Sequence, residues 1–225
     1  MQIKFKKDFR KFKEGSYIDF DFDDHQIIVL VGKNGSGKST IGYAIQNLIG
    51  TVKKTNYLNV GGTEQEYKNA VEITDADFNV VDTLCCVRDN PDSLSCGADA
   101  VSWFEAGGYA TKTASHGNKQ SYIFGQMLSR NANIEKSDKM NLFVIDEIDS
   151  GLDLKMRHMM GSYGLSNIAI KNNANIIFIT HCPMMIMLLE LMCDAAIFDV
   201  DEMKYTTADE YIKKTCGFKL KISSE

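Results

Sequence analysis

Proline is nearly absent from this chain of 225 residues, and its net charge is small. Only Pro91 and Pro183 occur, so a proline-rich linker or recognition segment is excluded. The formal charge of −5 argues against a protein that holds nucleic acid through bulk positive charge. The hydrophobic fraction of 44% and the charged fraction of 24% are ordinary for a globular protein, so disordered and collagen-like chains are excluded too.

The sequence also lacks paired cysteines and a long apolar run. None of the six cysteines forms a C-x-x-C pair, and no cysteine and histidine cluster has the spacing of zinc ligands. The N-terminal MQIKFKKDF does not resemble a signal peptide, and charged residues and a proline interrupt the most apolar stretch, residues 176–198. We therefore expect a cytoplasmic protein with reduced thiols and no transmembrane segment of its own.

Short apolar runs predict a central sheet. Four of them show no polar alternation, which is typical of strands buried on both faces of a parallel sheet; they are residues 27–31, 142–145, 176–179 and 195–198. Residues 17–24 alternate polar and apolar side chains, which predicts a half-exposed antiparallel strand. After Lys38, apolar residues recur at helical spacing from Ile41 to Ile49, and Gly50 is a suitable helix stop.

Together these elements predict one α/β domain over residues 1–225. We expect a mostly parallel core sheet flanked by helices, with an antiparallel β layer near the N-terminus. Residues 51–117 are polar, and one or two strands with a small helical region are expected there. The methionine-rich segment 183–192 is interpreted as a buried helix rather than as an adaptable docking surface.

A glycine-rich string follows the first of the apolar runs. Residues 32–40 read GKNGSGKST, which satisfies the pattern G-x-x-x-x-G-K-[ST] between a strand and a helix. Its glycines let the backbone curl so that N–H groups point at one anion, at the N-terminus of the helix. Lys38 can then reach the β and γ phosphates, and the Ser39 hydroxyl can take one position on a magnesium ion. The pattern predicts binding of ATP with Mg²⁺, and its candidate nucleotide-binding residues are Gly32, Asn34, Gly35, Ser36, Gly37, Lys38, Ser39 and Thr40.

An acidic pair ends the run LFVIDE at residues 142–147. A phosphate loop needs a carboxylate on a neighbouring strand to hold the metal, and Asp146 is the candidate. Glu147 is the candidate group that polarises the attacking water. The alternative is a pair of acids that caps a helix, which explains the position but not the partnership with the loop.

His181 follows the apolar run at residues 176–179. At the end of a strand in this sheet, a histidine can lie beside the γ-phosphate and sense it through a hydrogen bond. A lone histidine in such a place is more often a satisfied core residue. Beside the two motifs above, a catalytic role is the favoured interpretation.

Several strings resemble the motifs of ABC-type ATPases. IDEIDSGLD, residues 145–153, resembles their acidic strand end and D-loop, and ITHCP at 179–183 matches their switch histidine. SHGNKQS at 115–121 is similar to their signature motif, in the S-H-G-E form of small stand-alone ATPases related to the RecF, overcoming-lysogenization-defect and structural-maintenance-of-chromosomes groups. DFRKF at 8–12 is similar to the N-F-[RK]-S-F segment of that branch.

The resemblance implies an ABC-type P-loop fold and an ATP-sandwiched homodimer. In such proteins Ser115 and Gly117 of one subunit would contact the γ-phosphate that the loop of the other subunit holds. It also implies that Asp153, in the D-loop, contributes to the nucleotide site. Phe9, Arg10 and Phe12 could stack on or flank the base, with core packing of the two phenylalanines favoured. Residues 51–130 would contain a small helical subdomain with the signature motif. The segment VRDNP, residues 87–91, would replace the usual Q-loop.

These observations favour a soluble ATPase whose ATP-driven dimerisation switches a partner protein or a nucleic-acid process such as repair, recombination or defence. Three alternatives stay open. They are the nucleotide-binding subunit of a membrane transporter, an ATP-sensing regulator that hardly turns over, and, least favoured, a P-loop kinase. The sequence names no partner for any of them.

Overall fold

The computed structural model describes residues 1–49, 63–84, 139–150, 152–172 and 174–217. Its largest element is a six-stranded sheet in the order β5-β6-β7-β3-β8-β9. All neighbouring pairs are parallel except β8 and β9. The strands are β3 (Ile27–Val31), β5 (Phe78–Leu84), β6 (Met140–Asp146), β7 (Ala174–Ile179), β8 (Ala196–Asp199) and β9 (Lys204–Thr206).

A second, smaller sheet is antiparallel and has the order β2-β1-β4. Its strands are β1 (Gln2–Phe5), β2 (Tyr17–Asp19) and β4 (Val71–Thr74). The antiparallel layer predicted near the N-terminus is therefore confirmed. The predicted strand over residues 17–24 is wrong in its second half, because β2 ends at Asp19. The Asp21 carboxylate accepts the N–H of Asp23 at 3.0 Å, and this local turn replaces the strand.

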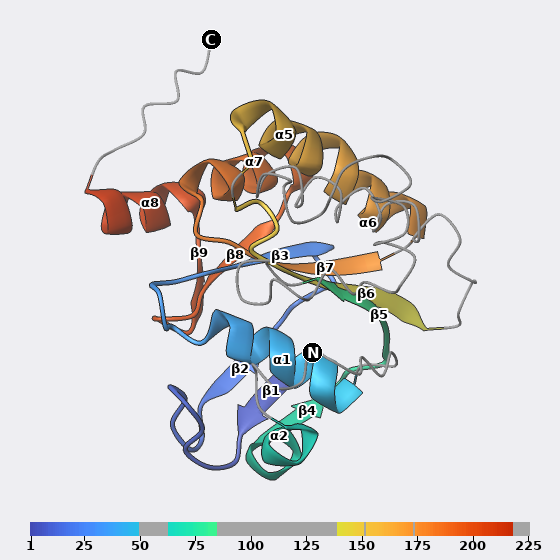
Figure 1. Ribbon diagram of the computed structural model, residues 1–225, viewed down its shortest axis with the longest axis vertical. Helices are drawn as coiled ribbons and strands as arrows, with labels where there is room; N and C mark the ends of the chain where they lie inside the picture. The colour runs from blue at the N-terminus through green and yellow to red at the C-terminus, as the bar shows by residue number, and fades with distance from the viewer. Residues whose placement is uncertain (50–62, 85–138, 151, 173, 218–225) are drawn as a thin grey trace, which may run out of the picture.

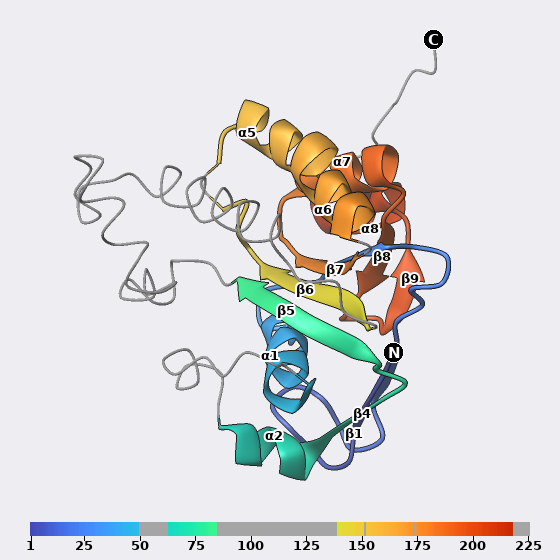
Figure 2. The same ribbon diagram turned by 90° about the vertical axis from the view of Figure 1, so that its right-hand side faces the viewer.

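Helices cover both faces of the large sheet (Figure 1). On one face, α1 (Lys38–Ile49) lies between the large sheet and the antiparallel sheet, beside α2 (Glu64–Ala70). The other face is covered by a run of consecutive helices, by α7 (Pro183–Cys193) and by α8 (Ala208–Cys216). That run consists of α5 (Leu154–Met159), the π-helix η2 (Met160–Leu165) and α6 (Ser166–Asn172). Figure 2 shows the same layers from the side.

The sheet is apolar on both faces because its strands contribute to two cores. In β3, Ile27, Val29 and Val31 pack into the core beneath α7 and α8. Ile28 and Leu30 point the other way, into the core shared with α1 and the antiparallel sheet. This two-residue alternation between two buried faces explains the unbroken apolar runs of the sequence.

The helix predicted after Lys38 is confirmed as α1, and the helix predicted over residues 183–192 as α7. One face of α7 is buried, in keeping with the interpretation as a buried helix, whereas Met184, Leu191 and Met192 on its other face are 40–63% exposed. In residues 51–117 the described part contains α2, β4 and β5. The predicted subdomain at 51–130, the signature string and the segment 87–91 lie wholly or largely outside the described residues. Among the described helices, none is long and apolar enough to cross a bilayer.

Candidate nucleotide site

The phosphate loop connects β3 to α1 and requires its glycines. Gly32, Gly35 and Gly37 have φ angles of 149°, 77° and 100°, which L side chains rarely adopt. At two of these glycines there is also no space for a side chain. A Cβ on Gly37 would lie 2.6 Å from the ring of Phe12, and one on Gly32 would lie 2.6 Å from Ser36 Oγ. The glycine pattern is thus explained by backbone conformation and by close packing around the loop.

Lys38 lies inside the loop rather than in solvent. Its side chain amine donates to the carbonyl oxygens of Gly32 at 2.9 Å and Lys33 at 3.1 Å. Lys38 is only 4% exposed, and this burial lowers the pKa of its amine, against the opposing effect of the Glu147 and Asp146 carboxylates. A buried cation among carbonyl oxygens, next to two acids, is well placed to receive a phosphate group.

Glu147 and His181 come together at the ends of neighbouring parallel strands. Glu147 follows β6 with a φ of 50°, and its N–H donates to the carbonyl of Ile179 at 2.9 Å. His181 Nε2 lies 2.8 Å from Glu147 Oε1, with both side chains about one third exposed. The left-handed conformation of Glu147 is uncommon for a residue with a side chain, and strained residues of this kind often occur at functional sites.

One hollow of about 470 Å³ is lined by several of the predicted residues. Its wall includes Glu147 and His181 together with the whole loop segment 34–40. Asp146 is 8% exposed and does not line this hollow, but its carboxylate raises the pKa of the Lys38 amine against the effect of burial. Lys11, which no sequence motif marks as a site residue, also lines this hollow, next to the predicted Arg10.

Arg10 and Lys11 form the tip of a tight turn. Phe9 and Phe12 exchange backbone hydrogen bonds of 2.9 and 3.0 Å across this turn, and Arg10 has a φ of 55°. The Arg10 guanidinium lies over the rings of Phe9 and Tyr67, 5.5 and 5.6 Å from their centroids, and donates to Thr40 Oγ1 at 3.4 Å. The turn and the two rings therefore place the Arg10 guanidinium next to the phosphate loop.

The two phenylalanines of this turn belong to the protein interior. Phe12 stacks on Phe5 with centroids 4.1 Å apart, and Phe9 meets Tyr67 edge to face at 5.1 Å. The sequence interpretation that favoured core packing over base stacking is consistent with these contacts.

The acidic end of β6 and the phosphate loop offer oxygen atoms of the kind that magnesium prefers. Asp146 offers a carboxylate at the end of the strand, and Ser39 offers a hydroxyl on the wall of the hollow. Among the described residues, no group of three or more His, Cys, Asp or Glu side chains gathers to hold a metal. One carboxylate and one hydroxyl suit a magnesium ion that arrives with nucleotide phosphates and keeps several waters.

The predicted D-loop is tied to the segment that carries His181. Asp149 is 2% exposed, and its carboxylate accepts the Thr180 hydroxyl at 2.8 Å. The same hydroxyl accepts the N–H of Cys182 at 2.9 Å, so both neighbours of His181 are held. Burial raises the pKa of Asp149, while the Thr180 hydrogen bond lowers it. No pattern in the sequence indicated this link.

The remaining predicted site residues do not line this hollow or lie outside the described residues. Asp153 is exposed and caps α5, where its carboxylate accepts the N–H of Met156 at 2.8 Å. Its contact with nucleotide stays a prediction. Ser115 and Gly117, like Arg88 and Asp89, lie outside the described residues.

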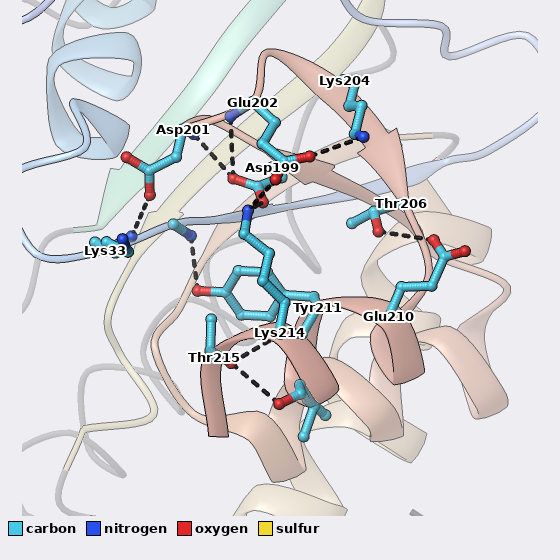
Figure 3. Close-up of polar contacts among 12 residues, drawn as sticks. Lys33, Asp199, Asp201, Glu202, Lys204, Thr206, Glu210, Tyr211, Lys214 and Thr215 are labelled. Atoms are coloured by element: carbon cyan, nitrogen blue, oxygen red, sulfur yellow. Dashed lines mark hydrogen bonds and ion pairs between the residues drawn. The ribbon is translucent and has the colours of Figure 1, made fainter. Parts of the chain in front are cut away.

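Two hydrogen bonds that hold the phosphate loop could not be predicted from the sequence. The N–H groups of Gly32 and Lys33 donate to Tyr211 and Asp201, which lie near the C-terminal end of the described chain (Figure 3). Neither residue is part of a recognisable motif, and more than 160 positions separate each from its partner. Only the fold brings them to the loop.

The class of protein follows from this geometry and from sequence comparison. A parallel sheet, a phosphate loop between β3 and α1, an antiparallel N-terminal layer and a Glu–His pair at neighbouring strand ends define the ABC-type P-loop fold predicted from the sequence. Residues 5–88 match the family described as AAA ATPase domain. The described part of the chain therefore has an α/β fold with a phosphate loop, and residues 5–88 are similar to a family of ATPases. Its assignment to the RecF and chromosome-maintenance branch stays a prediction.

Two solved structures are similar over most of their length. One is described as a cobalt transport ATP-binding protein; it shares 15% identity, covering 94% of this chain and 80% of that one, with a TM-score of 0.45. The other is a dimeric ATP-binding cassette in a post-hydrolysis state with ADP and phosphate; it shares 15% identity, covering 92% and 98%, with a TM-score of 0.48. No match was found among curated proteins. Likeness at this level says nothing about the activity or partners of this chain.

Proposed function

We propose that this chain binds ATP with Mg²⁺ and hydrolyses it, and that the nucleotide acts as a switch for a partner protein or a nucleic-acid process. The observation that carries this proposal is the Glu147–His181 pair, 2.8 Å apart on the wall of the hollow that the phosphate loop lines. A loop alone would support nucleotide binding. An acid and a histidine at the same hollow supply the groups that hydrolysis needs.

Binding rests on the loop amides and on the neighbouring cations. The described part of the chain offers no acceptor for the N–H groups of Asn34, Gly35 and Gly37, which are left to donate to phosphate oxygens. Lys38 exchanges its carbonyl partners for the β and γ phosphates. Arg10, held over its two rings, adds a positive charge at the same wall.

Ser39 and Asp146 would hold the magnesium ion, Ser39 directly and Asp146 directly or through water. When bound, the ion neutralises charge on the β and γ phosphate oxygens. Asp146 is suited to this role because its buried carboxylate already lies within the electrostatic field of Lys38. Their hydroxyl and carboxylate oxygens are the ligand types that magnesium prefers.

Glu147 acts as the base in the chemical step. Its carboxylate takes a proton from a water whose oxygen forms a bond to the γ phosphorus, while the bond from that phosphorus to the β–γ bridging oxygen breaks. The products are ADP and inorganic phosphate. His181 donates from Nε2 to the Glu147 carboxylate or to the γ-phosphate, and thereby reports which of the two is present.

The active form is proposed to be a homodimer with ATP between the subunits. Its second half would come from Ser115 and Gly117 of the other copy, as the ABC resemblance implies, with Asp153 near the shared interface. Each site is then incomplete in the monomer. We propose a cytoplasmic location, in keeping with the free thiols of Cys182, Cys193 and Cys216.

Hydrolysis is tested with His181→Gln. The wild-type chain is expected to release phosphate from Mg²⁺-ATP, and the variant to lose about 10²-fold in kcat with little change in ATP affinity. A phosphate-release assay and a binding titration measure the two quantities. His25→Gln is the matched control, because His25 is also hydrogen bonded, to the carbonyl of Asp194 at 2.8 Å, but lies outside the hollow.

Two outcomes would overturn this proposal. Wild-type protein that binds ATP and releases no phosphate would be an ATP-sensing regulator instead. Equal kcat in His181→Gln and wild-type protein would remove His181 from the mechanism.

A further inference from the structure

Two consecutive amides at the start of the phosphate loop have side-chain acceptors from the far end of the chain (Figure 3). The N–H of Gly32 donates to the hydroxyl of Tyr211 at 3.0 Å, and this contact is buried. The N–H of Lys33 donates to the Asp201 carboxylate at 2.7 Å. Tyr211 belongs to α8, and Asp201 to the turn between β8 and β9. The first two amides of the loop are thus aimed at protein acceptors.

These contacts fix the part of the loop that must turn. The carbonyls of Gly32 and Lys33 are the acceptors of the Lys38 amine, and the Lys33 carbonyl also accepts the N–H of Ser36 at 3.0 Å. A rotation of either peptide plane would therefore move both the cation and the following turn. The hydrogen bonds of these two N–H groups therefore help to orient the rest of the loop, where phosphate would bind.

The acceptors are themselves held by a network of charges. Asp199, whose side chain is 3% exposed, lies 2.7 Å from the Lys214 amine of α8. Its other carboxylate oxygen accepts the N–H of Asp201 at 2.9 Å, which shapes the turn. Lys214 also pairs with Glu202, as Figure 3 shows. Helix α8 and the β8–β9 turn therefore form one unit that contacts the loop at two points.

We propose that Tyr211 is a positioning residue of the nucleotide site, and that α8 is coupled to nucleotide occupancy through it. This inference rests on the proposed nucleotide binding. A loop held by Tyr211 in the conformation that accepts phosphate binds nucleotide more tightly, because less ordering is left to the binding step. By reciprocity, a nucleotide that holds the loop also stabilises the contacts of α8.

The direct test is the ADP affinity of Tyr211→Phe, measured by calorimetry with Mg²⁺. Loss of the hydroxyl leaves the buried Gly32 N–H without its acceptor, and we expect ADP to bind about 3- to 10-fold more weakly. Tyr205→Phe is the matched control. The Tyr205 hydroxyl also accepts a backbone N–H at 3.0 Å, that of Asp21, but neither residue lines the hollow. A general loss of stability would affect both variants, whereas positioning affects the ADP affinity of Tyr211→Phe alone.

The reciprocal effect is measured by hydrogen exchange of the backbone amides in α8. In wild-type protein, and in Tyr205→Phe, saturating ADP should slow exchange in α8. In Tyr211→Phe at equal ADP saturation, this slowing should be largely lost. An α8 that responds to ADP equally in all three proteins would overturn the coupling.

A second pair of variants tests the other contact and does not depend on the stability of Tyr211→Phe. Asp201→Asn keeps an oxygen for the Lys33 amide, and Asp201→Ala does not. Both remove the carboxylate that pairs with Lys11 at 2.5 Å, so their difference isolates the amide contact. The alanine variant should bind ADP several-fold more weakly than the asparagine variant, and equal affinities would contradict the role of this acceptor.

The outcomes separate this inference from the proposed function. Wild-type protein that binds neither ATP nor ADP would refute the nucleotide site itself. Wild-type protein that binds ADP with the same affinity as Tyr211→Phe would leave the site in place and refute the positioning role.

Discussion

Lys38→Ala is expected to remove the stabilisation that ATP gives to this protein. In wild-type protein, ATP at 100 times its dissociation constant should raise the free energy of unfolding by about 2.7 kcal/mol. With an affinity 10²- to 10⁴-fold weaker, the variant should gain at most about 0.4 kcal/mol at the same concentration. Thermal unfolding with and without Mg²⁺-ATP measures the difference.

The size of this effect follows from the place of the amine. Lys38 is buried, and its amine donates to two loop carbonyls and to the Ser36 hydroxyl. Its exchange onto two phosphates makes charge-assisted hydrogen bonds, each of about 1.5–3 kcal/mol. Their loss corresponds to a decrease in affinity of about 10²- to 10⁴-fold.

Lys33→Ala is the control for this experiment. Lys33 is in the same loop, but its side chain is exposed and it contributes backbone groups to the site. Its variant should keep the ATP-dependent stabilisation. If Lys38→Ala folds poorly, Lys38→Met is measured in its place, because methionine keeps much of the side-chain volume and lacks the amine. Unchanged ATP affinity in a folded Lys38 variant would contradict the assignment of the phosphate loop.

Glu147→Gln is expected to abolish most turnover and to preserve ATP binding. The amide cannot take a proton from water, so kcat should fall by about 10²- to 10⁴-fold. Shape and backbone are kept, because glutamine has the same length and the left-handed conformation at this position is unchanged. Single-turnover hydrolysis and ATP titration separate the chemical step from binding.

The control for the acid is Glu66→Gln. Glu66 accepts the N–H of Thr63 in the capping box of α2, a role that a glutamine oxygen can fill. Its turnover should equal that of wild-type protein. Normal turnover in Glu147→Gln would mean that another group activates the water, and the geometry of the Glu–His pair would then be structural.

Local patterns in the sequence were sufficient for most of the large sheet. The unbroken apolar runs of β3, β6, β7 and β8 reflect burial on both faces of the sheet. Such burial requires consecutive apolar residues, which are visible in the sequence itself. The short edge strand β9 and the strand β4 were not predicted individually, because each has only three or four residues. Strand β4 also pairs with β1, which lies far away in sequence. Strand β2 was predicted too long, because the pattern did not reveal the turn at Asp21.

The site shows the same division. The residues proposed for its chemistry could be predicted because nucleotide chemistry fixes their types and their places: Lys38 in the loop, and Asp146, Glu147 and His181 at or just after strand ends. The supporting residues Tyr211, Asp201 and Thr180 were missed. They act through single hydrogen bonds across 31 to 179 positions of sequence, and many residue types could provide such an acceptor. The fold alone selects them.

The proposed dimer is the central claim, and the solution mass of Glu147→Gln tests it most directly. The variant should bind ATP without consuming it and so hold any ATP-dependent assembly in place. We expect a dimer with Mg²⁺-ATP and a monomer with Mg²⁺-ADP, measured by light scattering after size exclusion. A monomer in both conditions, with ATP demonstrably bound, would contradict the ATP-sandwiched homodimer.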